Sequence, residues 1–555
     1  MSSRVHAIAW LAAILTVLMA MKFAALPGDP PYGIDASYYF QIANHVARGH
    51  GFVTTVSLYH EGLILPSPSQ IYPLWPLLLG YVGRAIGIVR AANLLPPIFY
   101  FLSLVLLYVL SRAVALQVGR LRWAERWYVP DAAHLIVALF GVNLSYFGAT
   151  THPYTEGLAF TFAFASFAAL QRIGTPASAP AGPQASRACV LRGGEDAARP
   201  AGEDAGVPMR LVFTRRDVWA FVAGGAAGLA FLGRSQMIAV AVGTVPVLIL
   251  AAWRNPRLRR GLVAYLATAA AVVIPWIVYL GRIPGLRFAG EWKSVAKIAV
   301  PLYFEPGEFG SVLSRFESAA SAILHAFSFA SDMSYTRTFG PAALLPPIAA
   351  VLVLLAMRRR GVRALPADTP IVTHALILAG LFVFVVLVFF PSAFGLRHLF
   401  GWRHGLTHVF LLIPAVSYLL GRQRLWTWTT AAILILSIAL GGSTVLASVV
   451  HSVPLTLRTS ERAAVSWLAR RQPVPKVLTT NAQILGSVSD AHYHWTDCNS
   501  PGLSTRGMVE RLKIDYVLVY EGEKRCAFVD GVFDYLKVVQ VFEDSRLRVY
   551  LLAPR

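Results

Sequence analysis

The stretch from Gly33 to Phe52, GIDASYYFQIANHVARGHGF, follows the first long apolar run and begins the first long polar loop of the chain. It contains one acid, Asp35, followed by two tyrosines and a helical pattern that ends at Gly49-His50-Gly51. An acid in this position is a candidate catalytic group if the loop lies at a membrane surface. Its role therefore depends on whether the chain spans a membrane and on which side this loop lies.

The composition is that of a membrane protein. Of the 555 residues, 56% are hydrophobic and 14% are charged, whereas a soluble domain has about 25% charged residues. Many apolar runs reach the length of about 20 residues that a helix needs to cross a bilayer. The net charge of +21 comes mostly from short loops between these runs, a pattern typical of cytoplasmic loops. We therefore expect membrane lipids around the chain and no nucleic-acid partner.

Eleven apolar runs are predicted to be membrane-spanning helices, with the N-terminus in the cytoplasm. In this topology every cytoplasmic loop is basic, although the predicted outer segment 391–404 is basic as well. The apolar segment from Tyr72 to Gly87 is predicted to be an interfacial helix, because counting it as a span would move the Arg-rich loops outside. The predicted spans are residues 5–26, 93–112, 132–148, 157–170, 218–233, 236–253, 262–280, 341–357, 371–390, 406–420 and 427–450.

The segments between and after the spans predict two domains. Residues 1–450 form a membrane domain with outer loops at 27–92 and 281–340 and a disordered cytoplasmic loop at 174–210, which is rich in Ala, Pro, Gly and Ser. Residues 451–555 form a small soluble α/β domain outside the membrane. This domain has a helix from Thr459 to Arg471 and strands at 476–480, 516–520, 537–542 and 547–552. An oxidising compartment would allow a disulfide between its two cysteines, Cys498 and Cys526.

Ionisable side chains near the predicted membrane surface are the candidate functional groups, because they are costly there and commonly functional. Asp35 and Glu156 fall at the outer ends of different helices. Asp35 could equally cap a helix, and Glu156 could be a first-turn acid favoured by the helix dipole. Basic side chains in this region either extend to lipid head groups or bind phosphate. They are Arg234, which interrupts an apolar run, and an outer cluster of Arg397, His398, Arg403 and His404.

Motifs for other chemistry are sparse. The tail contains residues of the types found in metal sites, but their short polar loop is a poor match to a zinc pattern. No Walker loop, no GxGxxG after a strand and no GxSxG motif occurs, so we predict no nucleotide-driven reaction. The residues of this possible metal cluster are His492, His494, Asp497 and Cys498.

The order of these features resembles the GT-C superfamily of membrane glycosyltransferases, which includes the aminoarabinose transferases of lipid A and the protein O-mannosyltransferases. The resemblance extends over about residues 5–450. In such families the first outer loop has an acid, then a tyrosine, then a helix that ends in glycine, which matches Asp35, Tyr38 or Tyr39, and Gly49. The remaining matches are a juxtamembrane helix at 72–80, a second acid at Glu156, an arginine at Arg234 and a basic pair at Arg403-His404.

The resemblance implies a fold and a location. The fold would be a polytopic α-helical membrane protein with about eleven transmembrane helices and a small C-terminal α/β extracytoplasmic domain. The chain would lie in the cytoplasmic (inner) membrane of a bacterium, with its C-terminal domain in the periplasm.

The resemblance also implies an enzyme that moves a sugar from a polyprenyl-phosphate donor to a hydroxyl group of a lipid, glycan or protein acceptor, with inversion. Many relatives have two adjacent acids at the first site, where this chain has Ala36, so no metal cofactor is expected, although a divalent ion between Asp35 and Glu156 stays open. The alternatives to an enzyme are a secondary transporter, a lipid-linked sugar flippase and a non-catalytic assembly protein. The implied site residues are Asp35 and Glu156 for catalysis, Arg234, Arg403 and His404 for the donor phosphate, and Tyr38, Tyr39, His152 and Lys293 for other substrate contacts.

Overall fold

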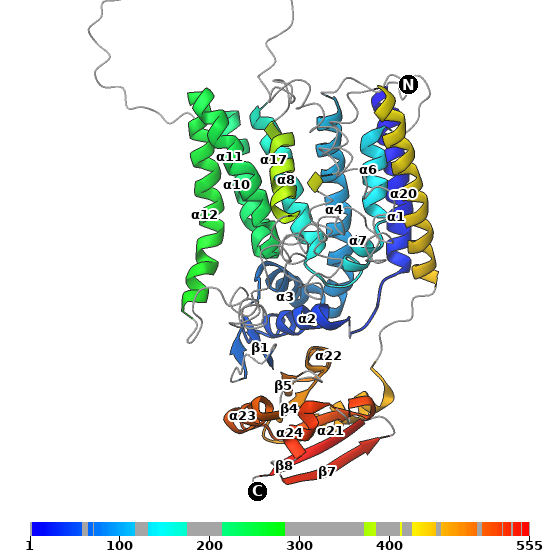
Figure 1. Cartoon of the computed structure of the whole chain (residues 1–555), viewed down its shortest axis with the longest axis vertical. Coiled ribbons are helices and arrows are strands. Elements are labelled where there is room, and N and C mark those ends of the chain that lie inside the picture. Colours follow the sequence, from blue (N-terminus) through cyan, green and yellow to red (C-terminus); the bar gives the residue numbers. More distant parts are fainter. Residues whose placement is uncertain are drawn as a thin grey trace, which may run out of the picture.

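The helices of the membrane domain form a bundle, with two further layers at one end of it (Figure 1). A first layer contains two short helices of the first outer loop, α2 and α3, and a second contains the C-terminal sheet. The N-terminus lies at the opposite end of the bundle from the C-terminal domain. This computed structural model describes residues 3–30, 32–57, 65–69, 71–116, 131–174, 214–282, 371–384, 411–412, 424–450, 457–496, 502–523, 526–533, 537–544 and 547–553.

Four of the described helices are long and apolar enough to cross a membrane. Each corresponds to a predicted span, which confirms several membrane-spanning helices. The total of eleven stays a prediction, because the predicted span 341–357 and nearly all of 406–420 lie outside the described residues. The four helices are α1 (Ser3–Ala24), α4 (Ile88–Leu116), α12 (Arg259–Gly281) and α20 (Arg424–Val450). Further helices of the bundle are α6 (Ala132–Gly141), α8 (Glu156–Gly174), α10 (Arg215–Gly233), α11 (Ile238–Arg254) and α17 (Ile371–Phe384).

One predicted span of the bundle differs from the structure in detail, and the predicted break between two spans at Arg234 is confirmed. The predicted span 132–148 is divided at Asn143, whose side chain accepts a hydrogen bond from the backbone N–H of Tyr146 and so caps the short helix α7 (Leu144–Ala149). Between α10 and α11 the chain bends at Arg234, which has extended backbone angles, and continues through one short 3-10 turn. At both breaks a helix ends within the apolar bundle. The N–H and C=O groups at the helix ends then have no partner within the helix and can form hydrogen bonds with other residues.

The first outer loop supplies the layer next to the bundle. Helix α2 (Ile34–Ala47) packs against α3 (Leu74–Ile86), and Arg84 of α3 donates a hydrogen bond of 3.0 Å to the carbonyl oxygen of Val46 near the end of α2. Both helices lie beneath the bundle (Figure 1), and α3 has only 13 residues. The predicted segment is therefore a helix of this loop, followed directly by α4, and its interfacial position stays a prediction. A two-stranded antiparallel ladder joins β1 (Val53–Thr54) to β3 (Ser67–Pro68).

The C-terminal region forms the predicted α/β structure around one six-stranded mixed sheet. Its strand order is β2-β5-β4-β6-β8-β7, parallel from β2 to β6 and antiparallel at β8 and β7. Four strands were expected, and β5 (His492–Trp495) was missed because its two histidines suggested a metal loop. The other elements are α21 (Thr459–Ala469), β4 (Lys476–Thr479), α22 (Ala482–Gly486), α23 (Gly502–Leu512), β6 (Tyr516–Tyr520), α24 (Ala527–Phe533), β7 (Lys537–Asp544) and β8 (Leu547–Ala553).

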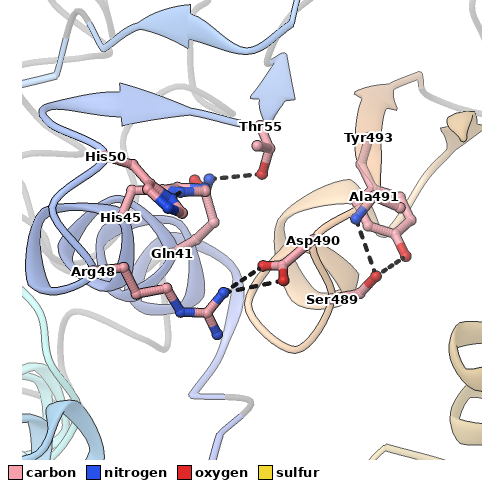
Figure 2. A network of polar contacts seen from close by, with 9 residues as sticks. All are labelled: Gln41, His45, Arg48, His50, Thr55, Ser489, Asp490, Ala491 and Tyr493. Atoms are coloured by element: carbon pink, nitrogen blue, oxygen red, sulfur yellow. Dashed lines mark hydrogen bonds and ion pairs between the residues drawn. The ribbon is translucent and has the colours of Figure 1, made fainter. Parts of the chain in front are cut away.

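One strand of this sheet comes from outside the predicted domain 451–555. Strand β2 (Val56–Ser57) belongs to the first outer loop and pairs in parallel with β5. Val56 is fully buried in one hydrophobic cluster with Tyr38 and Ile42 of α2 and with apolar side chains of the C-terminal region. Arg48 at the end of α2 also forms an ion pair with Asp490, in which its Nη1 atom lies 2.9 and 3.0 Å from the two carboxylate oxygens (Figure 2). Helix α2 and the sheet therefore share a core.

The structure describes one of the two cysteines of the predicted disulfide. Cys526 is buried and forms a disulfide bond, and its partner lies outside the described residues. The pairing of Cys526 with Cys498 stays a prediction.

Candidate functional site

Asp35 lies in the first turn of α2 and is half-buried. The helix begins after Gly33, which occupies the N-cap position and makes no side-chain cap hydrogen bond. Asp35 is therefore inside the helix, and its interpretation as an N-cap is wrong. Its carboxylate still benefits from the positive end of the helix dipole, which stabilises a negative charge in the first turn.

The start of α2 is fixed by contacts with the turn that precedes α8. Gly33 has a φ of 105°, a conformation that L side chains rarely adopt. A Cβ atom at Gly33 would lie 3.1 Å from the hydroxyl group of Tyr154, so glycine also permits this close approach. Next to Tyr154, the carbonyl oxygen of Pro153 accepts a 2.6 Å hydrogen bond from the indole of Trp75, on α3. These contacts bring the segment with Asp35 against the turn that leads to Glu156.

Glu156 and Arg234 form a buried ion pair. Glu156 is the first residue of α8 and its side chain is 2% exposed. Arg234 is the C-cap of α10, with a side chain that is 14% exposed, and its Nη1 contacts Oε1 of Glu156. Its Nε also donates a 3.2 Å hydrogen bond to Gln236. Stabilisation by the helix dipole alone therefore does not describe Glu156, because this carboxylate has a specific buried cation as its partner.

Lys22 is a further charged residue at this end of the bundle, and the prediction from sequence missed it. It lies in the last turn of α1 and has 0% exposure. Its ammonium group donates hydrogen bonds to the carbonyl oxygen of Phe147 and to the hydroxyl groups of Thr150 and Thr151. The available signal was a lysine near the end of an apolar run, close to the start of the first outer loop, since intramembrane charges are commonly functional.

His152 lies in the same turn and is half-buried, with an edge-to-face contact to the ring of Tyr154 at 6.1 Å between centroids. Burial, and secondarily the positive charge of Lys22, lowers the pKa of His152 from 6.5 to about 4. The imidazole is therefore neutral at pH 7. Among the described residues, none forms a hydrogen bond with its Nδ1 atom. The Nδ1 atom is buried, so the substrate contact of His152 stays a prediction.

The two predicted tyrosines lie on different sides of α2. Tyr38 is 6% exposed and packs in the cluster that α2 shares with the C-terminal sheet. Tyr39 is half-buried and packs with the cluster of α2, α3 and α4. Of this pair, Tyr39 is thus on the side of α2 that also contacts Tyr154. Lys293, Arg397, His398, Arg403 and His404 lie outside the described residues.

A divalent ion between Asp35 and Glu156 stays an open prediction. Oε1 of Glu156 contacts Arg234, and Ala36 follows Asp35 where a second acid would be needed. Among the described residues, no group of three or more His, Cys, Asp or Glu side chains could hold a metal ion. In the tail, His492 and His494 belong to β5 and both have a pKa lowered mainly by burial, while Asp497 and Cys498 lie outside the described residues.

Comparison with known proteins supports a fold class. No protein-family model and no curated protein matches the sequence. The structure is similar to the oligosaccharyltransferase of Archaeoglobus fulgidus, solved in complex with zinc and sulfate, with a TM-score of 0.56 and 12% identity over 97% of this chain and 72% of that chain. The same archaeal enzyme, AglB, solved with an inhibitory peptide and a dolichol-phosphate, gives a TM-score of 0.55 and 10% identity over 98% of this chain and 74% of that chain.

A weaker likeness is to ArnT from Cupriavidus metallidurans bound to undecaprenyl phosphate, with a TM-score of 0.41 and 14% identity over 98% of both chains. We base the fold class on the archaeal enzyme. The chain therefore has the GT-C fold: a multi-pass helical membrane domain followed by a C-terminal domain with a mixed sheet.

Proposed function

We propose that this chain is a glycosyltransferase that moves a sugar from a polyprenyl-phosphate donor to a hydroxyl group of a lipid, glycan or protein acceptor, with inversion, at the outer face of the cytoplasmic membrane. The observation that most supports this proposal is the contact between the start of α2 and the turn before α8. It brings Asp35 and Glu156, which are far apart in the sequence, toward one end of the bundle. The similar archaeal enzyme was solved with a dolichol-phosphate, a lipid of the proposed donor class.

In the proposed reaction Asp35 is the general base. It removes the proton from the acceptor hydroxyl group, and the oxygen attacks the anomeric carbon from the face opposite the phosphate. The bond between the anomeric carbon and the phosphate oxygen breaks, and its electron pair leaves with the polyprenyl phosphate. A single displacement of this kind inverts the configuration. Removal of a positioned general base typically costs 10²–10⁴ in rate.

The leaving phosphate needs positive charge more than it needs a proton, because the transition state accumulates negative charge on its oxygens. Arg234 has five N–H donors, and among the described residues it uses Nη1 for Glu156 and Nε for Gln236. We assign one of its remaining donors to a phosphate oxygen. Glu156 then holds the guanidinium in place and orients it. Arg403 and His404 are proposed as the other phosphate ligands, and Lys293, His152 and Tyr39 as contacts to the sugar or the acceptor.

The test of this proposal is the transfer of label by purified protein in proteoliposomes. A radiolabelled polyprenyl-phosphate sugar is supplied with an extract of envelope lipids and glycans, and labelled acceptor is counted. We expect Asp35→Asn to lower transfer by about 10²–10⁴-fold, because the amide cannot accept the proton. Asp29→Asn is the matched control, since Asp29 is an exposed acid of the same loop, and it should retain wild-type transfer.

The same experiment separates the alternatives. A flippase would move the labelled lipid across the bilayer unchanged, and an assembly protein would neither move nor transfer it. Full transfer by Asp35→Asn would contradict the assignment of the base, and translocation of the unchanged label without any transfer would contradict the enzymatic function.

A further inference from the structure

Lys22 has an unusual environment for a lysine in a membrane-spanning helix. Long basic side chains near helix ends normally extend to the lipid head groups, but Lys22 has 0% exposure. Its Nζ atom lies 2.8 Å from Oγ1 of Thr150 and 2.8 Å from Oγ1 of Thr151, and it also bonds the carbonyl oxygen of Phe147. The rings of Tyr100 and Phe147 lie 4.8 and 4.3 Å from the ammonium group.

These contacts use the whole hydrogen-bonding capacity of the side chain. An ammonium group has three N–H donors, and Lys22 has three oxygen acceptors. The two threonine hydroxyl groups donate their own protons to backbone carbonyls, Thr150 to Tyr146 at 2.6 Å and Thr151 to Phe147 at 2.7 Å. Their lone pairs are therefore available to accept from Lys22. No donor of Lys22 remains for a substrate phosphate, so this lysine differs in role from a phosphate ligand.

The acceptors of Lys22 all belong to the segment that leads to Glu156. Phe147 is in α7, and Thr150 and Thr151 begin the turn that precedes α8. A Cβ atom at Gly157 would lie 3.1 Å from Cγ2 of Thr150, so the methyl group of Thr150 packs beside the first turn of α8. The far part of the same turn contacts the start of α2 through Tyr154.

We propose that Lys22 is a positioning residue: its buried ammonium group ties the end of α1 to the turn 147–155 and thereby fixes the placement of Glu156 relative to α2. This inference rests on the proposed function for its catalytic consequence, but the positioning itself does not. A buried ammonium group is tolerated only where its hydrogen bonds are made, so the turn cannot leave Lys22 without leaving a charge unpaired. The constraint holds the turn in one arrangement.

The test uses the full-length variant Lys22→Met, which keeps the length of the side chain and removes the charge and the donors. Hydrogen–deuterium exchange of the peptide that covers 147–156 should become at least about 10-fold faster, because the turn loses three hydrogen bonds. Binding of undecaprenyl phosphate should keep the wild-type Kd, and the turnover of labelled donor should fall by about 10²-fold, as expected for a misplaced catalytic group. Phe23→Leu, an exposed neighbour in the same helical turn, should change none of these readouts.

Each outcome decides a separate point. Unchanged exchange in 147–156 would overturn the positioning role, and so would a Kd that rises with unchanged turnover, since that result would make Lys22 a phosphate ligand. If the wild-type protein transfers no label but Lys22→Met still accelerates exchange, the proposed function fails while the positioning role stands. If Lys22→Met does not fold, Thr151→Val is the second variant, because it removes one acceptor of Lys22. It should give a smaller increase in the exchange rate over the same segment. Exchange as slow as in the wild type would overturn the proposal.

Discussion

The ion pair between Glu156 and Arg234 allows a quantitative comparison at the scale of single residues. Its side chains are 2% and 14% exposed, whereas those of the pair between Arg48 and Asp490 are 48% and 72% exposed. Breaking a buried pair costs about 3–5 kcal/mol because the remaining charge has no partner, and an exposed pair contributes about 0–1 kcal/mol. A direct contact between an arginine and an acid therefore does not mean equal stabilisation at both sites.

We predict that Glu156→Gln strongly lowers the thermal stability of the protein in detergent, by an amount equivalent to about 3–5 kcal/mol. Asp490→Asn should lower it by about 1 kcal/mol or less. The double variant Glu156→Gln/Arg234→Gln should be more stable than either single variant, because it leaves no unpaired charge in the bundle. Equal melting temperatures for Glu156→Gln and Asp490→Asn would contradict this account.

At the scale of elements, the contact between α2 and the C-terminal sheet contains a titratable group. His45 on α2 is buried beside His50 of the following loop, with 3.4 Å between their Nδ1 atoms (Figure 2). Burial, followed by the charge of His50, lowers the pKa of His45 from 6.5 to about 4. Smaller effects come from Arg48 on α2 and His492 on β5, which lower this pKa, and from Asp490, which raises it.

We predict that acid weakens this contact between pH 6.5 and 4. In that range an unpacked His45 binds a proton that the packed His45 does not, so the packed state is fully favoured above pH 6.5 and loses stability as the pH falls. The thermal unfolding temperature should decrease from pH 7.5 to 4.5, and the decrease should be smaller in His45→Gln, which cannot be protonated. His6→Gln, at the opposite end of the bundle, should behave like the wild type. Equal decreases in His45→Gln and in the wild type would exclude His45 as the source.

At the scale of the whole molecule, the sequence predicts the single helices of the structure better than the contacts between distant segments. Apolar length and basic loops predict the positions of α1, α4, α12 and α20, because membrane crossing is a property of single helices. Resemblance predicts Asp35, Glu156 and Arg234 as site residues. It does not predict that Glu156 binds Arg234, because this pairing depends on the bend of the chain after α10. Lys22 has partners 125 to 129 positions away, which no local pattern indicates.

The connection between the two domains was equally hidden. Strand β2 has two residues, too few for an alternating pattern to predict a strand, and its partner β5 was interpreted as a loop. The predicted domain limit at 451 follows the change in composition, but the predicted C-terminal domain omits a strand that the sheet takes from the first outer loop. Because α2 contains Asp35 at one end, packs against α22 and shares a hydrophobic cluster with the C-terminal domain through Tyr38 and Ile42, we expect that domain to stabilise the helix of the candidate base.

We therefore predict that Val56→Asp destabilises the C-terminal domain and the first outer loop together. The new carboxylate would be buried in the shared cluster, and burial of an unpaired charge costs on the order of 3 kcal/mol or more. Limited proteolysis should then cut both the C-terminal domain and the segment around α2 faster than in the wild type. Val539→Asp is the matched control: Val539 is exposed on β7 at the far edge of the same sheet, so the same substitution should leave both cleavage rates unchanged. If Val56→Asp accelerates cleavage only within the first outer loop, the sheet is stable without β2 and the two domains fold as separate units.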